Sequence, residues 1–334
     1  MSHSDSPRLP AATTGSLLLS RLRLAFLALA VVGIGLIFPF PVEGRLWGNI
    51  FDLAHAPAFF CTLLAIVGLL DPSAVGLPKR LAIVIPMTIG RTAVVAVLLT
   101  VLGLVGEFLQ YFAGRNPSLK DVAANSAGLL AAFVWVSGGT TIGVKRFLAG
   151  LISVLLITVA SSGPLMNVWD CVQQLRQMPL LASFERALEL GSWRARDATM
   201  TLSTEWSTHG KTSLQVDLHP ARYPGVSFFW PNADWQGYQT FAVDLRNPTD
   251  RPLNLIIKVQ DREHRLSGKD PRDRFRRHVL LEPGQVQNVT IATSEIRRAP
   301  ENRSMRMDQI SLVQVFTSNL KDHTIFFVDN LRLE

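Results

Sequence analysis

Hydrophobic residues are distributed very differently in the two halves of the chain. Before about residue 165 they form long uninterrupted runs, and after it they form short alternating or β-branched segments. A helix that crosses a bilayer needs about 20 mostly apolar residues, whereas period-two alternation is typical of strands. The pattern therefore predicts a multi-domain membrane protein in which a transmembrane α-helical bundle precedes an all-β jelly-roll sandwich.

Five apolar runs are candidate membrane spans. They cover residues 24–40, 54–70, 92–112, 121–137 and 147–165. The third belongs to a longer run, 81–112, which Pro86, Gly90 and Arg91 interrupt. Residues 81–90 are therefore interpreted as an interfacial segment, and whether they enter the bilayer stays open. The predicted division is a disordered cytoplasmic N-terminus (1–20), a transmembrane domain (21–167), a juxtamembrane linker (168–183) and a β domain (184–334).

Basic residues in the short loops predict the orientation. Cytoplasmic loops carry an excess of Lys and Arg. With five spans, three basic pairs fall on one side: Arg21 and Arg23, Lys79 and Arg80, and Lys145 and Arg146. The expected location is the inner (cytoplasmic) membrane, in contact with its lipids, with the N-terminus cytoplasmic and the C-terminal domain periplasmic or extracellular. The formal charge of +7 does not indicate nucleic-acid binding, because no basic–aromatic motif accompanies it.

The second half alternates short predicted strands with turn signals. Gly, Pro and Asn-rich positions such as His209-Gly210, Asn247-Pro248 and Pro283-Gly284 separate them. The predicted strands cover residues 213–218, 239–245, 253–259, 286–291, 310–316 and 324–328. Short strands at this spacing favour an antiparallel sandwich or jelly roll.

Polar residues in the first half gather at the predicted outer ends of the helices. Asp52 and His55 share a helix face, as do Asp121 and Asn125 one turn apart. Glu107 lies between apolar residues, where a carboxylate needs a partner, and Arg115 is suited to bind it bidentately. The predicted polar pocket contains Asp52, His55, Glu107, Gln110, Arg115, Asp121 and Asn125.

The same residues carry a resemblance. The run Glu107-x-x-Gln110, Arg115 and Asp121-x-x-x-Asn125-x-x-Gly128, after an Asp–His pair, resembles the VanZ-like family of membrane proteins over residues 20–140. The family's pair carries a Lys and a His four residues after the Asp; here the spacing is one residue shorter and the Lys is missing. That family is associated with resistance to glycopeptides that act at the cell wall, so the resemblance implies a cell-envelope role.

Aromatic residues in the second half are candidates for sugar binding. A sugar presents flat apolar faces, so its site needs exposed rings with hydrogen-bonding neighbours. The stretch 223–238 supplies the best candidates, which are Tyr223, Trp230, Trp235 and Tyr238. A basic run at residues 272–277 is interpreted as a solvated strand edge, with binding to an acidic polymer or to lipid headgroups as the alternative.

A second resemblance covers residues 183–334. It rests on Phe184-Glu185, Trp193, His209-Gly210-Lys211-Thr212, Asp234-Trp235-x-Gly237-Tyr238 and Phe327-Val328-Asp329-Asn330. In that order these motifs resemble carbohydrate-binding modules of the galactose-binding-like jelly-roll type. The resemblance implies that Glu185 and Asp329 hold a structural calcium ion, for which carboxylate oxygens are suited. The alternative is that Asp329-Asn330 simply ends a strand.

The function expected from both halves is a VanZ-like envelope protein with an outward-facing glycan-binding β domain. It would act in cell-wall or exopolysaccharide biology or in antibiotic resistance. One alternative is a membrane enzyme that acts on an envelope or lipid-linked substrate through His55, Glu107, Arg115 and Asp121. Another is that the β domain docks onto a protein, because a fold alone does not assign a ligand.

Overall fold

The structure is a computed structural model that describes residues 44–75, 85–112, 118–139, 143–229, 234–266 and 270–334. The described chain divides into two compact units. The helical unit contains Asn49–Leu165, and the β unit contains Glu43–Gly48 together with Met166–Glu334. The predicted first span, 24–40, and the predicted disordered segment, 1–20, lie outside the described residues.

The helical unit is built from four long helices. Their bounds, with one short 3₁₀ helix, are α2 (Arg45–Leu70), η1 (Pro72–Val75), α3 (Ile89–Phe112), α4 (Leu119–Ser137) and α5 (Val144–Arg176). Among the described residues, all four long helices have the length and apolar composition needed to cross a membrane. They contain the predicted spans 54–70, 92–112, 121–137 and 147–165. Residues 85–88 are not helical, and α3 begins at Ile89.

A small apolar core holds α2, α3 and α4 together. Phe59 and Leu63 of α2 are buried with Leu99 of α3 and Leu129 of α4. The opposite faces expose large apolar side chains. On α3, Val94, Val97, Leu98 and Val101 are each more than half exposed and recur at helical spacing. An apolar surface of this kind is typical of helices that face lipid.

The helix α5 continues beyond the predicted fifth span. It ends at Arg176 and the first strand begins at Leu180, so much of the predicted linker 168–183 is regular structure. The end of α5 belongs to the β unit, where buried Asp170 accepts hydrogen bonds from Arg45 (2.6 Å) and Arg186 (3.1 Å). Removal of either arginine would leave the buried negative charge of Asp170 with one counter-charge fewer.

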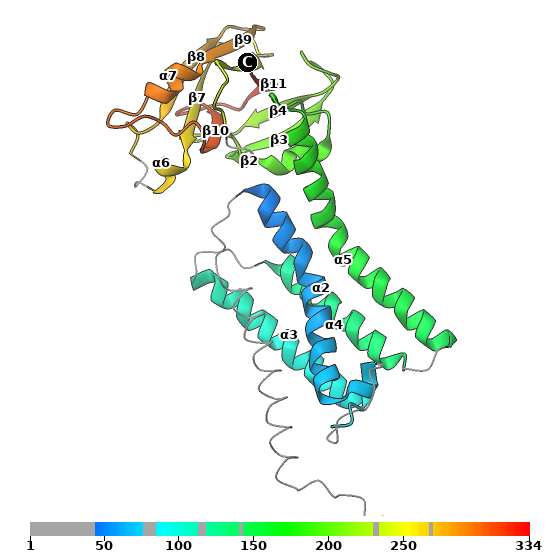
Figure 1. Ribbon diagram of the computed structural model, residues 1–334. Coiled ribbons are helices and arrows are strands. Elements are labelled where there is room, and N and C mark those ends of the chain that lie inside the picture. Colours follow the sequence, from blue (N-terminus) through cyan, green and yellow to red (C-terminus); the bar gives the residue numbers. More distant parts are fainter. Residues whose placement is uncertain (1–43, 76–84, 113–117, 140–142, 230–233, 267–269) are drawn as a thin grey trace, which may run out of the picture. The chain divides into compact units, whose positions relative to one another are not determined.

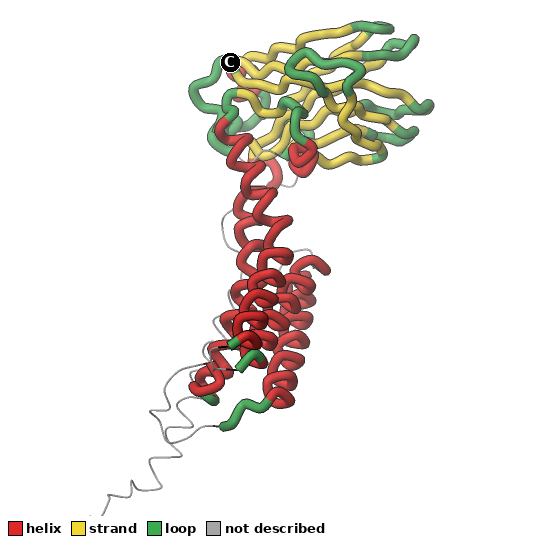
Figure 2. The backbone as a smooth tube through the Cα atoms, turned by 90° about the vertical axis from the view of Figure 1, so that its right-hand side faces the viewer, coloured by secondary structure: helices red, strands yellow, loops and turns green. Residues whose placement is uncertain are grey.

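The β unit is an all-antiparallel sandwich of two sheets (Figures 1 and 2). One sheet has the order β3-β4-β11-β6-β9, with β1 paired to β11, and the other has the order β2-β5-β10-β7-β8. The strands are β1 (Leu180–Ala182), β2 (Trp193–Arg196), β3 (Ala198–Ser203), β4 (Ser213–Leu218), β5 (Gly225–Phe228), β6 (Thr240–Arg246), β7 (Leu253–Asp261), β8 (Phe275–Leu281), β9 (Val286–Ala292), β10 (Ile310–Phe316) and β11 (Thr324–Leu333). Short helices complete the unit: η2 (Ala187–Ser192), α6 (Arg262–Leu266) and α7 (Thr293–Arg298).

The prediction of an all-β sandwich is confirmed, and the six predicted strands correspond to β4, β6, β7, β9, β10 and β11. The two sheets pack over a core rich in aromatic rings. Trp193 stacks on Phe228 with ring centroids 4.8 Å apart, and Trp235 stacks on Phe241 at 5.3 Å. Burial of such rings is a large contribution to the stability of a domain of this size.

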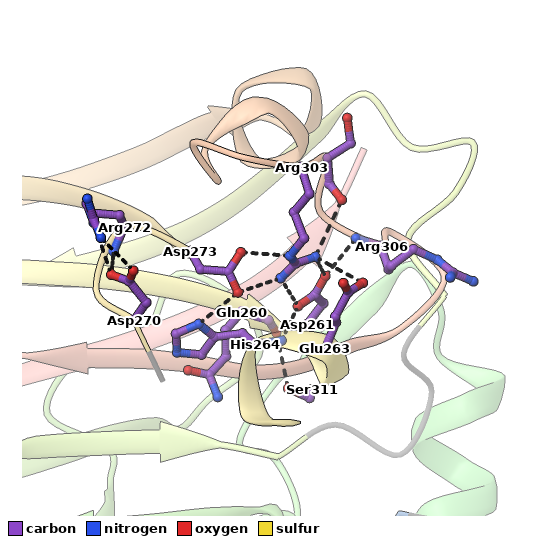
Figure 3. Close-up of polar contacts among 11 residues, drawn as sticks. Gln260, Asp261, Glu263, His264, Asp270, Arg272, Asp273, Arg303, Arg306 and Ser311 are labelled. Atoms are coloured by element: carbon purple, nitrogen blue, oxygen red, sulfur yellow. Dashed lines mark hydrogen bonds and ion pairs between the residues drawn. The ribbon is translucent and has the colours of Figure 1, made fainter. Parts of the chain in front are cut away.

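A partly buried guanidinium holds the loops at one end of the five-stranded sheet (Figure 3). Arg303 bonds Asp261 at 2.5 and 2.8 Å and Asp273 at 2.7 and 2.9 Å. Asp261, at the end of β7, is fully buried and also accepts the backbone N–H of His264. Burial alone would raise the pKa of Asp261, but the bonds from Arg303 hold it below its ordinary value. This cluster ties the segment before β8 and the segment between α7 and β10 to the end of β7.

Candidate functional site

The outer face of the five-stranded sheet carries a distinctive set of polar side chains. Successive residues of a strand point to opposite faces, so the core residues identify the other set. In β7, Leu255, Ile257 and Val259 belong to the sandwich core, and Ile256 and Lys258 therefore point outward. The same reasoning applied to each neighbouring strand defines the face that we call the outer face.

Strand register aligns one row of residues across all five strands of this face. The pairs are Arg194 with Ser227, Ser227 with Gln314, Gln314 with Lys258, and Lys258 with Arg276. Adjacent strands lie about 4.8 Å apart, so neighbours in the row are within reach of one ligand. The row combines three cationic groups with a hydroxyl and an amide.

A second row lies beside the first. Its order is Arg196, Gly225, Phe316, Ile256 and His278. At Gly225, an added Cβ would meet Phe316 Cβ at 2.4 Å. At this point of the β5–β10 pair, therefore, only glycine fits. The second row therefore supplies an apolar centre between an arginine and a histidine.

Lys258 is the unusual residue of the face, because it lies outside the sandwich core and is only 9% exposed. Burial and the nearby positive charges of Arg276 and Arg196 lower the pKa of Lys258 to about 8. Neither row contains an acidic residue in these five described strands. A ligand with negative charge would relieve the repulsion among these cations.

Tyr223 lies next to this face. Its ring meets that of Phe316 edge-on, with centroids 6.2 Å apart, and the Arg222 guanidinium lies 5.2 Å from its centroid. The side chain of Tyr223 is 40% exposed. Of the predicted sugar-binding aromatics, Tyr223 has the exposed ring that stacking on a sugar requires.

The other predicted aromatics have different positions. Trp235 is buried in the core against Phe241, so its ring offers no face to a ligand. Tyr238 is partly buried and packs against the same core. Trp230 lies outside the described residues. The predicted aromatic site is thus represented on the described surface by Tyr223.

The predicted calcium ligands, Glu185 and Asp329, have hydrogen-bonding roles. Glu185 Oε1 accepts the backbone N–H groups of Lys211 (2.7 Å) and Thr212 (2.8 Å). Asp329 Oδ2 accepts the backbone N–H groups of Thr208 (2.6 Å) and His209 (2.9 Å). Glu185 Oε1 and Asp329 Oδ2 thus each accept two backbone N–H groups, and through these bonds the two carboxylates fix the loop between β3 and β4. The calcium ion that the resemblance implies at Glu185 and Asp329 stays a prediction.

The predicted polar pocket is partly assembled in the helical unit. Asp52, His55 and Asp121 each offer a donor atom, and these atoms lie within 4.8 Å of one another. His55 Nδ1 lies 2.9 Å from Asn125 Oδ1, and both side chains are buried. Two helices, α2 and α4, therefore supply four of the predicted residues to one cluster.

Glu107 occupies a neighbouring position. Its carboxylate accepts the backbone N–H of Ser118 at 3.2 Å, and the Ser118 hydroxyl accepts the backbone N–H of Asp121. Glu107 is buried and is linked through the N-cap of α4 to the cluster. Arg115 lies outside the described residues, and for Gln110 the structure describes only the backbone within α3.

The sequence predictions did not include the outer face of the five-stranded sheet. A signal was available at Lys258, which interrupts the apolar segment 253–259 at a position out of phase with Leu253, Leu255 and Ile257. In the basic run 272–277, the two neighbouring arginines that lie in β8 point to opposite faces of the sheet. Arg276 points outward, whereas Arg277 bonds Glu295 of α7. Of that run, Arg276 therefore belongs to the rows of the outer face and Arg277 does not.

Comparisons with known proteins give partial similarities. No family model matches the chain. Among curated proteins, β-agarase A of Vibrio sp. (strain JT0107) is 34% identical over 65 residues, which are 20% of this chain and 6% of the relative. β-Agarase B of the same organism is 21% identical over 145 residues, which are 40% of this chain and 15% of the relative. The chain thus spans only a small part of these relatives.

Solved structures with similarity include carbohydrate-binding modules and agarases. A family 11 carbohydrate-binding module from Clostridium thermocellum, in complex with a β-1,3-1,4-mixed-linked tetrasaccharide, is 15% identical; the match covers 46% of this chain and 93% of the module, with a TM-score of 0.36. An exo-β-agarase is 11% identical over 46% of this chain and 25% of its own, with a TM-score of 0.38.

Proposed function

We propose that this chain is a membrane protein of the cell envelope whose β unit binds a polysaccharide across the outer face of the five-stranded sheet. The observation that carries the proposal is the row that joins Arg194, Ser227, Gln314, Lys258 and Arg276. Amide, hydroxyl and guanidinium groups are the donors and acceptors that bind sugar hydroxyl and acid groups. Tyr223, beside the row, adds a ring for stacking.

The charge of the face favours a polysaccharide that carries carboxylate or sulfate groups. The positive charges of Arg276 and Arg196 repel that of Lys258, and an anionic ligand would offset this repulsion. The similarity to two β-agarases supports the assignment to polysaccharides in general, since their name refers to agar. As a VanZ-like protein, the chain would use this binding in cell-wall or exopolysaccharide biology or in antibiotic resistance.

Retention on immobilised polysaccharides tests the binding. Full-length chain purified in detergent would be passed over alginate (carboxylated), carrageenan (sulfated) and agarose (uncharged). We expect retention on the two acidic matrices and elution by salt, because exposed ionic contacts are screened. Retention on agarose alone would contradict the preference for acidic polymers. Failure to bind any of the three would contradict the assignment.

The membrane location has a separate test. Four described helices have the length and apolar composition to cross a bilayer, and α3 exposes a wide apolar face. A reporter that is active only outside the cytoplasm, fused after Glu334, should be active. An inactive reporter would place the β unit in the cytoplasm and would remove the support for an envelope polysaccharide.

The cluster in the helical unit supports a second candidate function, a membrane enzyme that acts on an envelope or lipid-linked substrate. A buried histidine with two nearby carboxylates is suited to acid–base chemistry. The substitutions Glu107→Gln and Asp121→Asn should then abolish the cellular phenotype of the gene in protein that still reaches the membrane. An unchanged phenotype would contradict this role.

A further inference from the structure

The donor groups of Asp52, His55 and Asp121 converge from two helices. One donor atom from each residue lies within 4.8 Å of the other two. Asp52 and His55 are three residues apart on α2, and Asp121 lies in the first turn of α4. Convergence of one imidazole and two carboxylates from separate helices is the geometry by which helical bundles hold metal ions.

The hydrogen bond to Asn125 selects the tautomer of the His55 ring. The amide oxygen of Asn125 can only accept a hydrogen bond, so His55 Nδ1, at 2.9 Å, must carry the hydrogen. In the neutral ring, Nε2 then holds the lone pair that a metal requires. Metal-binding histidines are commonly oriented in this way by an oxygen behind the ring. Asn125 is buried with His55, which fixes the ring against rotation.

Close packing of the two helices fixes the spacing of the donors. At Gly128, a Cβ would stand 2.1 Å from the carbonyl oxygen of Ala56, the residue after His55. The helix backbones are therefore in direct contact less than one turn from Asn125. A third helix closes the arrangement, since a Cβ at Gly103 would meet Phe59 at 3.4 Å and Asn125 at 3.6 Å. The donors are held by backbone packing, which is what a preorganised site needs.

We infer that Asp52, His55 and Asp121 bind a divalent transition-metal ion, with Asn125 as the residue that positions His55. One nitrogen and two carboxylate oxygens suit Zn²⁺ and Mn²⁺. Three protein ligands leave a coordination position open for water or for an oxygen of a ligand. The inference is independent of polysaccharide binding by the β unit.

Metal binding is tested on the full-length chain in detergent. Chelator-treated protein would be titrated with Zn²⁺ and with Mn²⁺ by calorimetry, and metal content after purification would be measured by mass spectrometry. We expect about one bound ion per chain that is lost in a triple variant, Asp52→Asn, His55→Gln and Asp121→Asn. The control Glu205→Gln removes an exposed carboxylate of the β unit and should leave binding unchanged.

Two further measurements separate the metal site from a structural role. The variant Asn125→Leu keeps all three ligands and should weaken metal affinity by about 10- to 100-fold. Addition of Co²⁺ to unaltered protein should produce visible absorption bands that excess Zn²⁺ removes, a readout that needs no variant to fold. Absence of those bands, together with no calorimetric binding, would overturn the inference. Binding that persists in the triple variant would overturn it as well.

Discussion

Gly128 of α4 lies against the carbonyl oxygen of Ala56 in α2, where an added Cβ would stand 2.1 Å from that oxygen. No real Cβ tolerates such a distance from backbone, so a larger residue must separate the helices. Since His55 precedes Ala56 and Asn125 lies three residues before Gly128, separation would also pull apart the polar cluster. The glycine that matches the VanZ-like pattern thus has a specific steric role.

The first prediction follows from this contact. Gly128→Ala should destabilise the helical unit by about 1–3 kcal/mol, because it overpacks a close helix crossing. Thermal unfolding of the purified chain in detergent measures the loss. Gly106→Ala in α3 is the matched control, since an added Cβ there meets nothing within 4 Å. Helix propensity alone should make the control neutral or slightly stabilising. Equal behaviour of the two variants would contradict the steric role.

The second prediction concerns Arg303, which joins Asp261 and Asp273 (Figure 3). Arg303→Met should destabilise the β unit by about 3–5 kcal/mol, because it leaves the fully buried Asp261 without its main counter-charge. Chemical unfolding followed by tryptophan fluorescence gives the value. Arg306→Met removes an exposed arginine that pairs with Asp308 and should change stability little, because water screens an exposed ion pair. A similar cost for both variants would be inconsistent with this account.

How far the sequence predicted the fold depends on the length and pattern of each element. The strands β4 (Ser213–Leu218) and β10 (Ile310–Phe316) match the predicted segments residue for residue. The four-residue strands β2 and β5 were not predicted, because so few residues carry little periodic signal. The pairing of β2 with β5, and of β5 with β10, is set by tertiary contacts.

The candidate sites were predictable to different extents. The cluster of Asp52, His55 and Asp121 could be anticipated, because helical spacing places the residues at the same ends of neighbouring helices. Trp235 could not be distinguished from an exposed ring, since burial depends on Phe241 and the opposing sheet. The outer-face row depends on strand order and register, and these join Arg194 to Arg276 across 82 positions of sequence.

The third prediction concerns pH. Lys258 has a pKa of about 8 on the outer face, and an anionic ligand favours its charged form. Binding of an alginate oligosaccharide should therefore weaken on the order of tenfold between about pH 7 and pH 9, as the free amine loses its proton. Lys258→Arg keeps the charge over this range and should give a flat profile, measured by calorimetry. A pH dependence that persists in Lys258→Arg would assign the effect to another group.

The same pKa shift affects stability in the opposite direction. Folding lowers the pKa of Lys258 from 10.5, so the unfolded state binds more protons between about pH 8 and pH 10.5. Lys258 therefore contributes stability that increases as pH rises through this interval. In ligand-free protein, Lys258→Met should remove that increase, which denaturant unfolding at several pH values would detect.

The fourth prediction concerns Asp329. Asp329→Ala leaves the backbone N–H groups of Thr208 and His209 without their acceptor, at a cost of about 1–3 kcal/mol for each group that stays buried. Asp322→Ala is the control, because that carboxylate is exposed and pairs with exposed Arg251. If Glu185 and Asp329 act only as hydrogen-bond acceptors, added calcium should leave the melting temperature of the β unit unchanged. A rise that Glu185→Gln and Asp329→Ala each abolish would support the calcium site.

In the proposed function, cations on the outer face of the five-stranded sheet bind an acidic polysaccharide. The most direct test compares dissociation constants for an alginate oligosaccharide, measured on full-length protein by calorimetry. The variant set is Arg196→Gln, Lys258→Met and Arg276→Gln, and the charge-matched control is Lys211→Gln, Arg251→Gln and Arg272→Gln, all exposed residues away from the two rows. Each lost charge-assisted hydrogen bond is worth about 1.5–3 kcal/mol. The first set should lose measurable binding, while the control should stay within a few-fold of the unaltered chain. Equal dissociation constants for the two sets would contradict binding at the outer face.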